Sequence, residues 1–183
     1  RSGADASVVA ITAPKETACN IVGCRNTLQV GDEVSFSAFI KNEGDADITE
    51  MGYTVTIYLT DSSKAVGNVA KDTSGNDLIW ENADAMCDDA SVCDFDSNVD
   101  PLAAGAFLGG GKHTLQLTGG GGDIVWTPTI GEYMVEVAVD ADGDVDTSNN
   151  AELVYVVVED WYDINVDLTW MVDSGDGSGT LVE

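Results

Sequence analysis

Strict alternation of apolar and polar side chains is clearest in one stretch of the chain, Tyr53-Thr54-Val55-Thr56-Ile57-Tyr58-Leu59. A period of two, carried by β-branched and aromatic residues, is typical of a strand with one face buried. The same pattern recurs on either side, in Val34 to Ile40, Tyr133 to Val139 and Leu153 to Val158. No segment shows the apolar stripe of an amphipathic helix, and the 20 glycines are typical of a chain with many turns.

These patterns predict an all-β protein. The strands are expected near residues 6–12, 32–42, 51–60, 64–70, 112–118, 131–140 and 151–159. About seven short antiparallel strands indicate an immunoglobulin-like β-sandwich, which we assign to residues 1–160. Residues 71–110 are too long for a hairpin connection and are expected to be an inserted loop. The run Gly119–Gly122 is expected to be a flexible turn between two strands.

The charge of the chain excludes two classes of partner. Its 183 residues contain 7 Lys or Arg and 33 Asp or Glu, for a formal net charge of −26. Seven scattered cations cannot form the basic patch that nucleic acids or anionic lipid surfaces require. Hydrophobic residues make up 44% of the chain, which is enough for a folded core. No apolar run approaches the roughly 18 residues of a membrane-spanning helix, so direct membrane insertion is not expected.

The four cysteines form two close pairs, Cys19 with Cys24 and Cys87 with Cys93. Two disulfides in an oxidising, extracellular setting are the favoured interpretation. Zinc is the alternative, although four or five intervening residues fit poorly with the shorter spacing of zinc ribbons. The sequence opens at Arg1, which indicates a processed chain or part of a longer one.

The C-terminal extension, residues 161–183, contains one further amphipathic strand. Its apolar face consists of Ile164, Val166, Leu168 and Trp170. The residues that follow are rich in Gly, Ser and Asp, so no hairpin partner is expected after it. A lone strand is unstable in water and leaves its edges unpaired. It is therefore expected either to be inserted into another copy of the chain or to be the first strand of a following domain.

Two segments of the chain resemble CARDB-type modules, the immunoglobulin-like sandwiches of prokaryotic surface and adhesion proteins. The first is Gly31 to Gly44, which matches a strand and its following turn. The second is Gly131 to Asp140, followed by Asn149-Asn150, which matches the closing hairpin. The resemblance covers most of residues 5–159 and implies a non-catalytic spacer, adhesion or assembly module. The long insertion and both cysteine pairs depart from the family's pattern.

Two acidic loops have a spacing that suits calcium. Asp140, Asp142, Asp144 and Asp146 occupy alternate positions, as do Asp94, Asp96, Asn98 and Asp100. Calcium takes six to eight hard oxygen ligands, and alternate carboxylates in a turn supply them. Neither loop is an EF-hand, because Val145 and Val99 stand where that motif requires Gly. The other interpretation is that both loops are simply solvated.

The sequence offers little support for catalysis. His113 is the only histidine, and no nucleophile motif accompanies it. The run Gly109 to Lys112 is not a phosphate loop, because Ala106 stands at the first Gly position and His113 at the Ser/Thr position. Exposed Trp80 and Trp126 would suit stacking on sugars, although core packing is the simpler interpretation.

We therefore expect a non-catalytic extracellular module that forms a surface filament or adhesin. It would assemble head to tail with copies of itself, by strand addition or by packing against adjacent immunoglobulin-like domains. The alternative is a carbohydrate-binding accessory domain of a secreted hydrolase.

Overall fold

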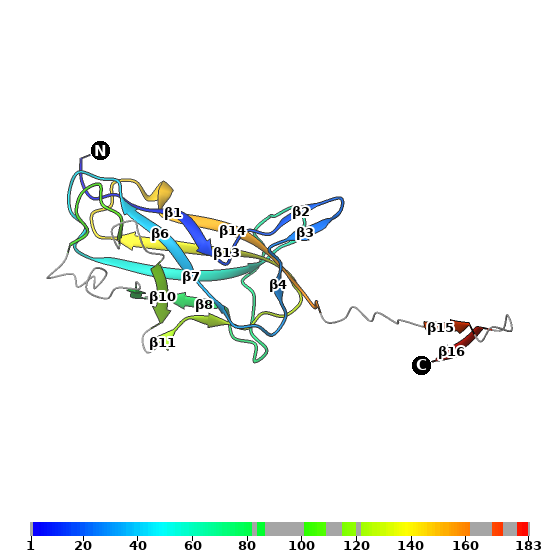
Figure 1. The fold of residues 1–183 in the computed structure, drawn as a ribbon. Coiled ribbons are helices and arrows are strands. Elements are labelled where there is room, and N and C mark those ends of the chain that lie inside the picture. The colour runs from blue at the N-terminus through cyan, green and yellow to red at the C-terminus, as the bar shows by residue number, and fades with distance from the viewer. Residues whose placement is uncertain are drawn as a thin grey trace.

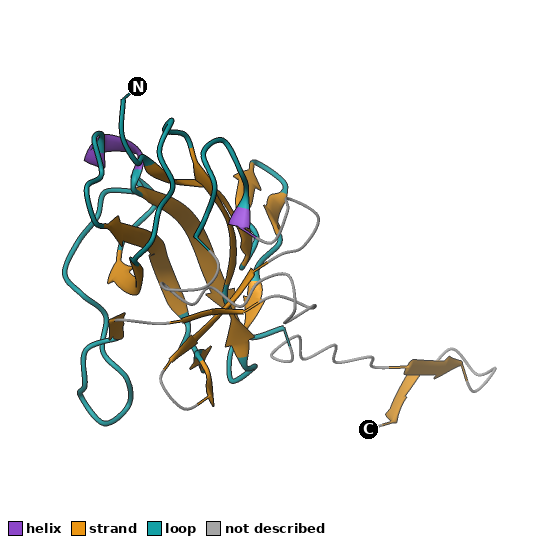
Figure 2. Ribbon diagram, turned by 90° about the vertical axis from the view of Figure 1, so that its left-hand side faces the viewer, coloured by secondary structure: helices purple, strands orange, loops and turns teal. Residues whose placement is uncertain are grey.

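The computed structural model describes residues 2–81, 84–86, 101–108, 115–119, 122–161, 170–173 and 179–182. Two five-stranded sheets form the body of the molecule (Figures 1 and 2). The first contains β1 (Ala6–Ala13), β6 (Ser37–Asn42), β10 (Leu115–Gly119) and β11 (Gly122–Asp123), with β9 (Asp84–Met86) also paired to β10. The second has the order β4 (Leu28–Gln29), β14 (Ala151–Glu159), β13 (Gly131–Ala141), β7 (Met51–Leu59) and β8 (Ile79–Glu81).

Three short pairs of strands complete the architecture. They are β2 (Ala18–Asn20) with β3 (Gly23–Arg25), β5 (Val34–Ser35) with β12 (Val125–Trp126), and β15 (Trp170–Asp173) with β16 (Gly179–Val182). Pairing in the body is antiparallel except for β14 with β4, which is parallel. The predicted immunoglobulin-like sandwich is thus confirmed.

The core lies between the two sheets, on the faces that the alternating pattern indicated. The second sheet contributes Val55, Ile57, Val135, Val137 and Val156, all fully buried. The first sheet contributes Val8, Ala38 and Ile40 from the other side of the core. Because residues i and i+2 of a strand share one face, β-branched side chains at alternate positions give a continuous apolar layer.

An aromatic cluster closes one part of the core. Trp126 stacks on Phe36 at a centroid distance of 6.5 Å and meets the edge of Tyr133 at 5.0 Å. The Tyr133 hydroxyl donates to the backbone carbonyl of Thr129 at 3.0 Å. A tyrosine near the start of a strand that bonds backbone a few residues upstream is the tyrosine corner of immunoglobulin-like sandwiches.

The strands predicted at 51–60, 131–140 and 151–159 are confirmed to within one residue. The strand predicted at 32–42 begins two residues later, at Val34, and divides at Phe36, where the chain passes from β5 to β6 and changes partner strands. The strand predicted at 64–70 is wrong. Lys64 has a positive φ of 59°, and the segment folds back on β7, leaving only an isolated bridge between Val69 and Tyr58.

The inserted segment 71–110 contains strands that the sequence did not predict. β8 extends the sheet of β7, whereas β9 pairs with β10 in the opposite sheet. Both are three residues long, which is too short for a periodic pattern to be recognised. The predicted turn at Gly119–Gly122 joins β10 to β11, which pair antiparallel.

Candidate functional sites

The first cysteine pair forms the predicted disulfide. Cys19 and Cys24 face each other across β2 and β3, with an S–S distance of 2.04 Å and Cα atoms 3.9 Å apart. The hairpin that they join projects from the sandwich (Figure 1). The second predicted pair, Cys87 and Cys93, lies outside the described residues.

The C-terminal extension differs from the prediction in one respect. Ile164, Val166 and Leu168 lie outside the described residues, whereas Trp170 begins β15. β15 pairs with β16 over Trp170↔Val182 to Asp173↔Gly179. The expectation that no hairpin partner follows is therefore wrong. Thr180-Leu181-Val182 is a short β-branched and apolar run, which favours a strand.

Part of the outer edge of β14 is exposed within the described residues. On one side β14 pairs with β13 along Ala151 to Val158. On the other side, within the described residues, its only strand partner is β4, which reaches just Val158 and Glu159. Ala151, Glu152 and Leu153 are exposed, and Leu153 retains 41% of its accessible surface. Unpaired strand edges of this kind are templates for pairing with another chain.

The four aspartates predicted to bind calcium are not brought together. Asp140 and Asp142 are exposed, whereas Asp144 and Asp146 are half-buried. Asp146 caps a short 3-10 helix (Thr147–Asn149) by accepting the Ser148 N–H at 3.0 Å, and Asp144 accepts the Asp146 N–H at 3.0 Å. Among the described residues, no three carboxylate, imidazole or thiol groups are arranged to hold a metal ion. Asp94, Asp96, Asn98 and Asp100 lie outside those residues.

Buried polar atoms lie in this loop and in the segment beside it. Asp5, a residue that sequence reasoning missed, is fully buried and accepts a hydrogen bond from Asn149 Nδ2 at 2.8 Å. The loop is held against this segment because Val145 N–H donates to the Ala4 carbonyl at 2.9 Å. Three buried acceptors here have no hydrogen-bond partner: Asp144 Oδ2, Asn149 Oδ1 and Asn150 Oδ1. Buried acceptors are nearly always paired, so three in one loop require an explanation.

The turn that resembles CARDB modules has a clear structural role. Asn42 is fully buried, and its Nδ2 donates to the carbonyls of Ala46 at 2.8 Å and Leu102 at 3.0 Å. Its Oδ1 accepts the Gly44 N–H at 3.0 Å and the Asp5 N–H at 3.3 Å. A Cβ at Gly44 would lie 2.0 Å from the Gly3 carbonyl oxygen, which explains the glycine. These motif residues therefore position backbone.

Of the two tryptophans proposed as glycan contacts, Trp80 and Trp126, neither is fully exposed. Trp126, predicted to be a possible glycan contact, is 3% exposed, so that prediction is wrong. Trp80 is half-buried and packs on Phe36 at 5.7 Å. Trp161, which the sequence analysis did not propose as a contact, is 49% exposed, and its Nε1 donates to Thr27 Oγ1 at 3.0 Å. The buried neighbours of Trp126 come from distant segments, so its burial could not be read from local sequence.

One tyrosine at the base of the β2–β3 hairpin has a shifted pKa. The pKa of Tyr155 is raised to about 12, chiefly by burial. The hydrogen bond to Glu132 and the charge of that carboxylate also contribute to this rise. The Lys64 ammonium lies 4.9 Å from the centre of the same ring.

His113 lies outside the described residues. Within them, no helix has the length and apolar character needed to cross a bilayer.

Comparison with known proteins finds a similarity of fold alone. No protein-family model matches the sequence, and no curated protein is significantly similar to it. Two solved structures of a CARDB domain are similar to this chain in fold. CARDB is also the type of module that the strand and turn motifs of the sequence resemble. The two structures are a crystal structure and a solution NMR structure of the CARDB domain of the PF1109 protein from Pyrococcus furiosus. Each is 16% identical in sequence to this chain and has a TM-score of 0.43. The match covers 86% of this chain in both cases, together with 96% of the crystallised chain and 97% of the chain in the NMR structure. The crystal structure is of that domain in complex with di-metal ions.

Proposed function

We propose that this protein is a non-catalytic extracellular structural module that assembles with copies of itself by strand addition. The observation that supports this most directly is the strand pairing at the C-terminal end. β15 and β16 pair with each other and with no strand of the sandwich in the described structure. An isolated two-stranded hairpin is at best marginally stable in water, so these strands gain by joining a larger sheet.

The acceptor for such a strand is the exposed edge of β14 in a neighbouring copy. This edge offers main-chain N–H and C=O groups at alternate residues between Ala151 and Leu153, since the others face β13, and Leu153 adds an exposed apolar side chain. Strand addition derives its affinity from main-chain hydrogen bonds and its specificity from alternate side chains. The donor would be the segment that leads into β15, with Ile164, Val166 and Leu168 before that strand and Trp170 as its first residue. Because donor and acceptor are different surfaces, repetition produces an open filament.

Two further observations support an extracellular setting and a role for calcium. A disulfide such as Cys19–Cys24 persists in oxidising compartments. The unpaired oxygens of Asp144 and Asn149, beside the buried carboxylate of Asp5, are the hard ligands that calcium prefers. Calcium binding at this end of the sandwich would neutralise part of a net charge of −26. The proposal thus places Asp5 and Asn149, rather than Asp140 and Asp142, beside the cation.

The test compares three forms of the chain by sedimentation velocity and negative-stain electron microscopy. The full chain should form beaded filaments. A chain ending at residue 160 should stay monomeric and folded, because every residue of the core cluster lies between Ala4 and Val158. The full chain with Val166→Ser and Leu168→Ser should also stay monomeric, and Leu59→Ser, which changes an exposed apolar residue elsewhere, serves as its control. Filaments formed by the truncated chain would contradict strand donation.

A further inference from the structure

The β2–β3 hairpin exposes its most apolar residues. Ile21 and Val22 form the turn between the two strands and retain 104% and 90% of their accessible surface. Every residue from Ala18 to Asn26 is exposed, so the hairpin adds nothing to the core. It projects from the sandwich with the turn between β2 and β3 foremost (Figure 1).

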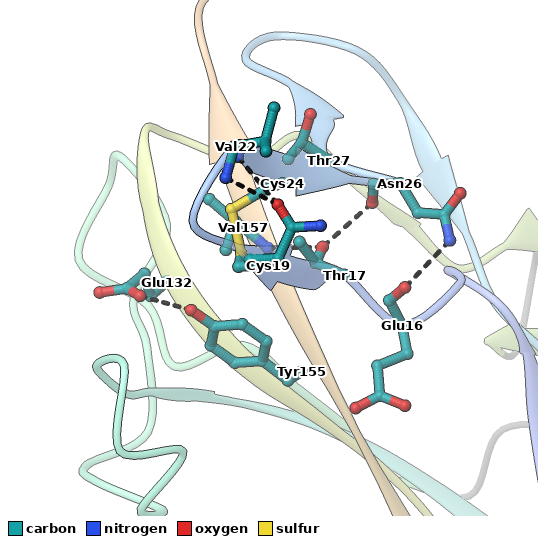
Figure 3. The surroundings of a disulfide bond; sticks show 12 residues. Glu16, Thr17, Cys19, Val22, Cys24, Asn26, Thr27, Glu132, Tyr155 and Val157 are labelled. Atoms are coloured by element: carbon teal, nitrogen blue, oxygen red, sulfur yellow. Dashed lines mark hydrogen bonds between the residues drawn. A yellow bond between two sulfur atoms is a disulfide. The ribbon is translucent and has the colours of Figure 1, made fainter.

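This hairpin is nevertheless held rigidly. The Cys19–Cys24 disulfide joins its strands, and Asn20 Oδ1 accepts the N–H groups of Val22 at 2.8 Å and Gly23 at 3.2 Å. At its base the buried Thr17 hydroxyl donates to the Asn26 carbonyl at 3.0 Å and accepts the Val157 N–H, also at 3.0 Å (Figure 3). A rigid projection loses little conformational entropy when it docks, which is how pre-organised binding elements gain affinity.

The residues of the turn contradict the local rules for turns. Turn positions favour Gly, Pro, Asn, Asp and Ser, and β-branched apolar residues are poor choices there. The chain follows the rule in two other tight turns, at Asp61 to Lys64 and at Asp72 to Gly75. Ile21 and Val22 therefore serve neither the turn nor the core. Positions where a sequence breaks its own local pattern are expected to be functional.

The charge around the hairpin is opposite to that of the rest of the molecule. Residues 15–26 contain Lys15, Arg25 and Glu16, a formal charge of +1, so the remainder of the chain has −27. Lys64 adds a further cation at the base, where it pairs with Glu16 at 3.2 Å. Three of the seven cationic side chains thus lie at or beside this projection.

We propose that the β2–β3 hairpin is a docking element whose Ile21-Val22 tip inserts against the acidic surface of a second copy of this chain. Charge complementarity selects the occupant, because a second copy presents −27 outside its own hairpin. The inference rests on the proposed self-assembly and adds a second contact to it. Two side chains bury too little surface to hold a dimer alone, so the contact acts by avidity with the added strand.

The test measures the protein concentration at which the full chain begins to assemble, by light scattering. The variant Ile21→Ser with Val22→Asn keeps turn-compatible residues and removes the apolar tip. Its control is Ile130→Ser with Val66→Asn, since those loop side chains are 64% and 48% exposed. We expect the tip variant to raise the threshold about tenfold and the control less than about twofold. Equal thresholds for the tip variant and the wild-type chain, at unchanged melting temperature, would overturn the proposal.

A second measurement separates this proposal from the proposed strand addition. A photoreactive benzophenone side chain at position 21 is placed in the full chain and in the chain that ends at residue 160. Crosslinking to an acidic segment of a second copy in both forms supports the docking element even if no filament forms. The proposal is overturned if no homodimeric crosslink forms at high concentration. It is also overturned if Arg25→Glu does not weaken the crosslink at low ionic strength. Loss of filaments in the Val166→Ser, Leu168→Ser chain tests strand donation alone.

Discussion

The three central strands β7, β13 and β14 and the β2–β3 hairpin are both antiparallel structures, but their side chains follow opposite rules. In the central strands, apolar residues at alternate positions are buried, and Val55, Ile57, Val135, Val137 and Val156 have no exposed surface. In the hairpin, Ile21 and Val22 are fully exposed, and covalent and polar contacts hold the strands together.

This difference separates residues that stabilise the chain from residues available to a partner. Burial of an apolar side chain contributes roughly 1.5–3 kcal/mol to folding, and an exposed one contributes almost nothing. Ile21 and Val22 do not stabilise the fold of their own chain, so they are available for contact with a partner. Changes in the two regions should therefore have different consequences, beginning with the free energy of unfolding.

The largest expected effect is in the central strands. Ile57→Ala removes buried methylene and methyl groups and leaves a cavity, so the free energy of unfolding should fall by about 2–5 kcal/mol. Ile21→Ala, the matched change in the hairpin, should alter it by less than about 0.5 kcal/mol. Urea denaturation followed by tryptophan fluorescence measures both. Similar losses in the two variants would show that the hairpin tip contacts the fold after all.

Calcium should give the next largest effect, at the end of the sandwich where buried acceptors are unpaired. A ligand that binds only the folded chain adds about 2.7 kcal/mol at a concentration 100-fold above its Kd. We therefore expect the melting temperature to rise when calcium replaces EDTA at fixed ionic strength. Asp5→Asn should abolish this rise, whereas Asp142→Asn, which changes an exposed aspartate of the same loop, should preserve it. No rise in the unmodified chain would refute calcium binding at both acidic loops.

The disulfide should have a smaller and more local effect. Chain-entropy arguments assign about 2 kcal/mol to a loop as short as that between Cys19 and Cys24. Because the hairpin buries nothing, Cys19→Ser with Cys24→Ser should loosen the hairpin without opening the core. Hydrogen exchange should accelerate at the Val22 and Gly23 amides and remain slow along β13. Faster exchange throughout β13 would mean that the hairpin stabilises the whole sandwich.

The sequence predicted the parts of this fold that follow a period, and missed those that depend on pairing between distant segments. β7, β13 and β14 each have nine or more residues, so alternation was unmistakable. β8, β9 and β12 have two or three residues, which hold no period. At Lys64 to Ala70 the apolar pattern was overruled by a positive φ and by contacts with β7.

The candidate sites show the same limit. The Cys19–Cys24 pairing was predictable because the two residues are close in sequence. The buried position of Asp5 beside Asn149 was not, since 144 residues separate them. Counting alternate aspartates pointed to residues 140–146, but it could not show that Asp5 meets Asn149 beside that loop. The exposure of Ile21 and Val22 could have been suspected, because β-branched residues directly inside a short cysteine loop are poor turn formers.

The smallest expected effect is a pH dependence at the base of the hairpin, where Tyr155 joins the central strands to Thr17 through its backbone carbonyl. Burial and Glu132 raise the pKa of Tyr155 from 10.0 to about 12. Below pH 10 the phenol is protonated in both the folded and the unfolded chain, so its contribution to stability is fully present. Between pH 10 and about 12 the unfolded chain releases the proton while the folded chain retains it, so the free energy of unfolding falls as pH rises.

Urea midpoints across this pH range should decline less steeply for Tyr155→Phe, which has no phenol to titrate. Glu132→Gln should make the decline shallower and end it at a lower pH, because it removes the carboxylate that disfavours the tyrosinate and so lowers the pKa of Tyr155 in the folded chain. Val22→Asn should leave the profile unchanged, since the tip is separate from the base. A Tyr155→Phe profile that parallels the wild-type profile would show that the decline arises from other groups. If the Val22 change also moved the profile, the tip and the base would be coupled, and the separation between core and docking residues would not hold.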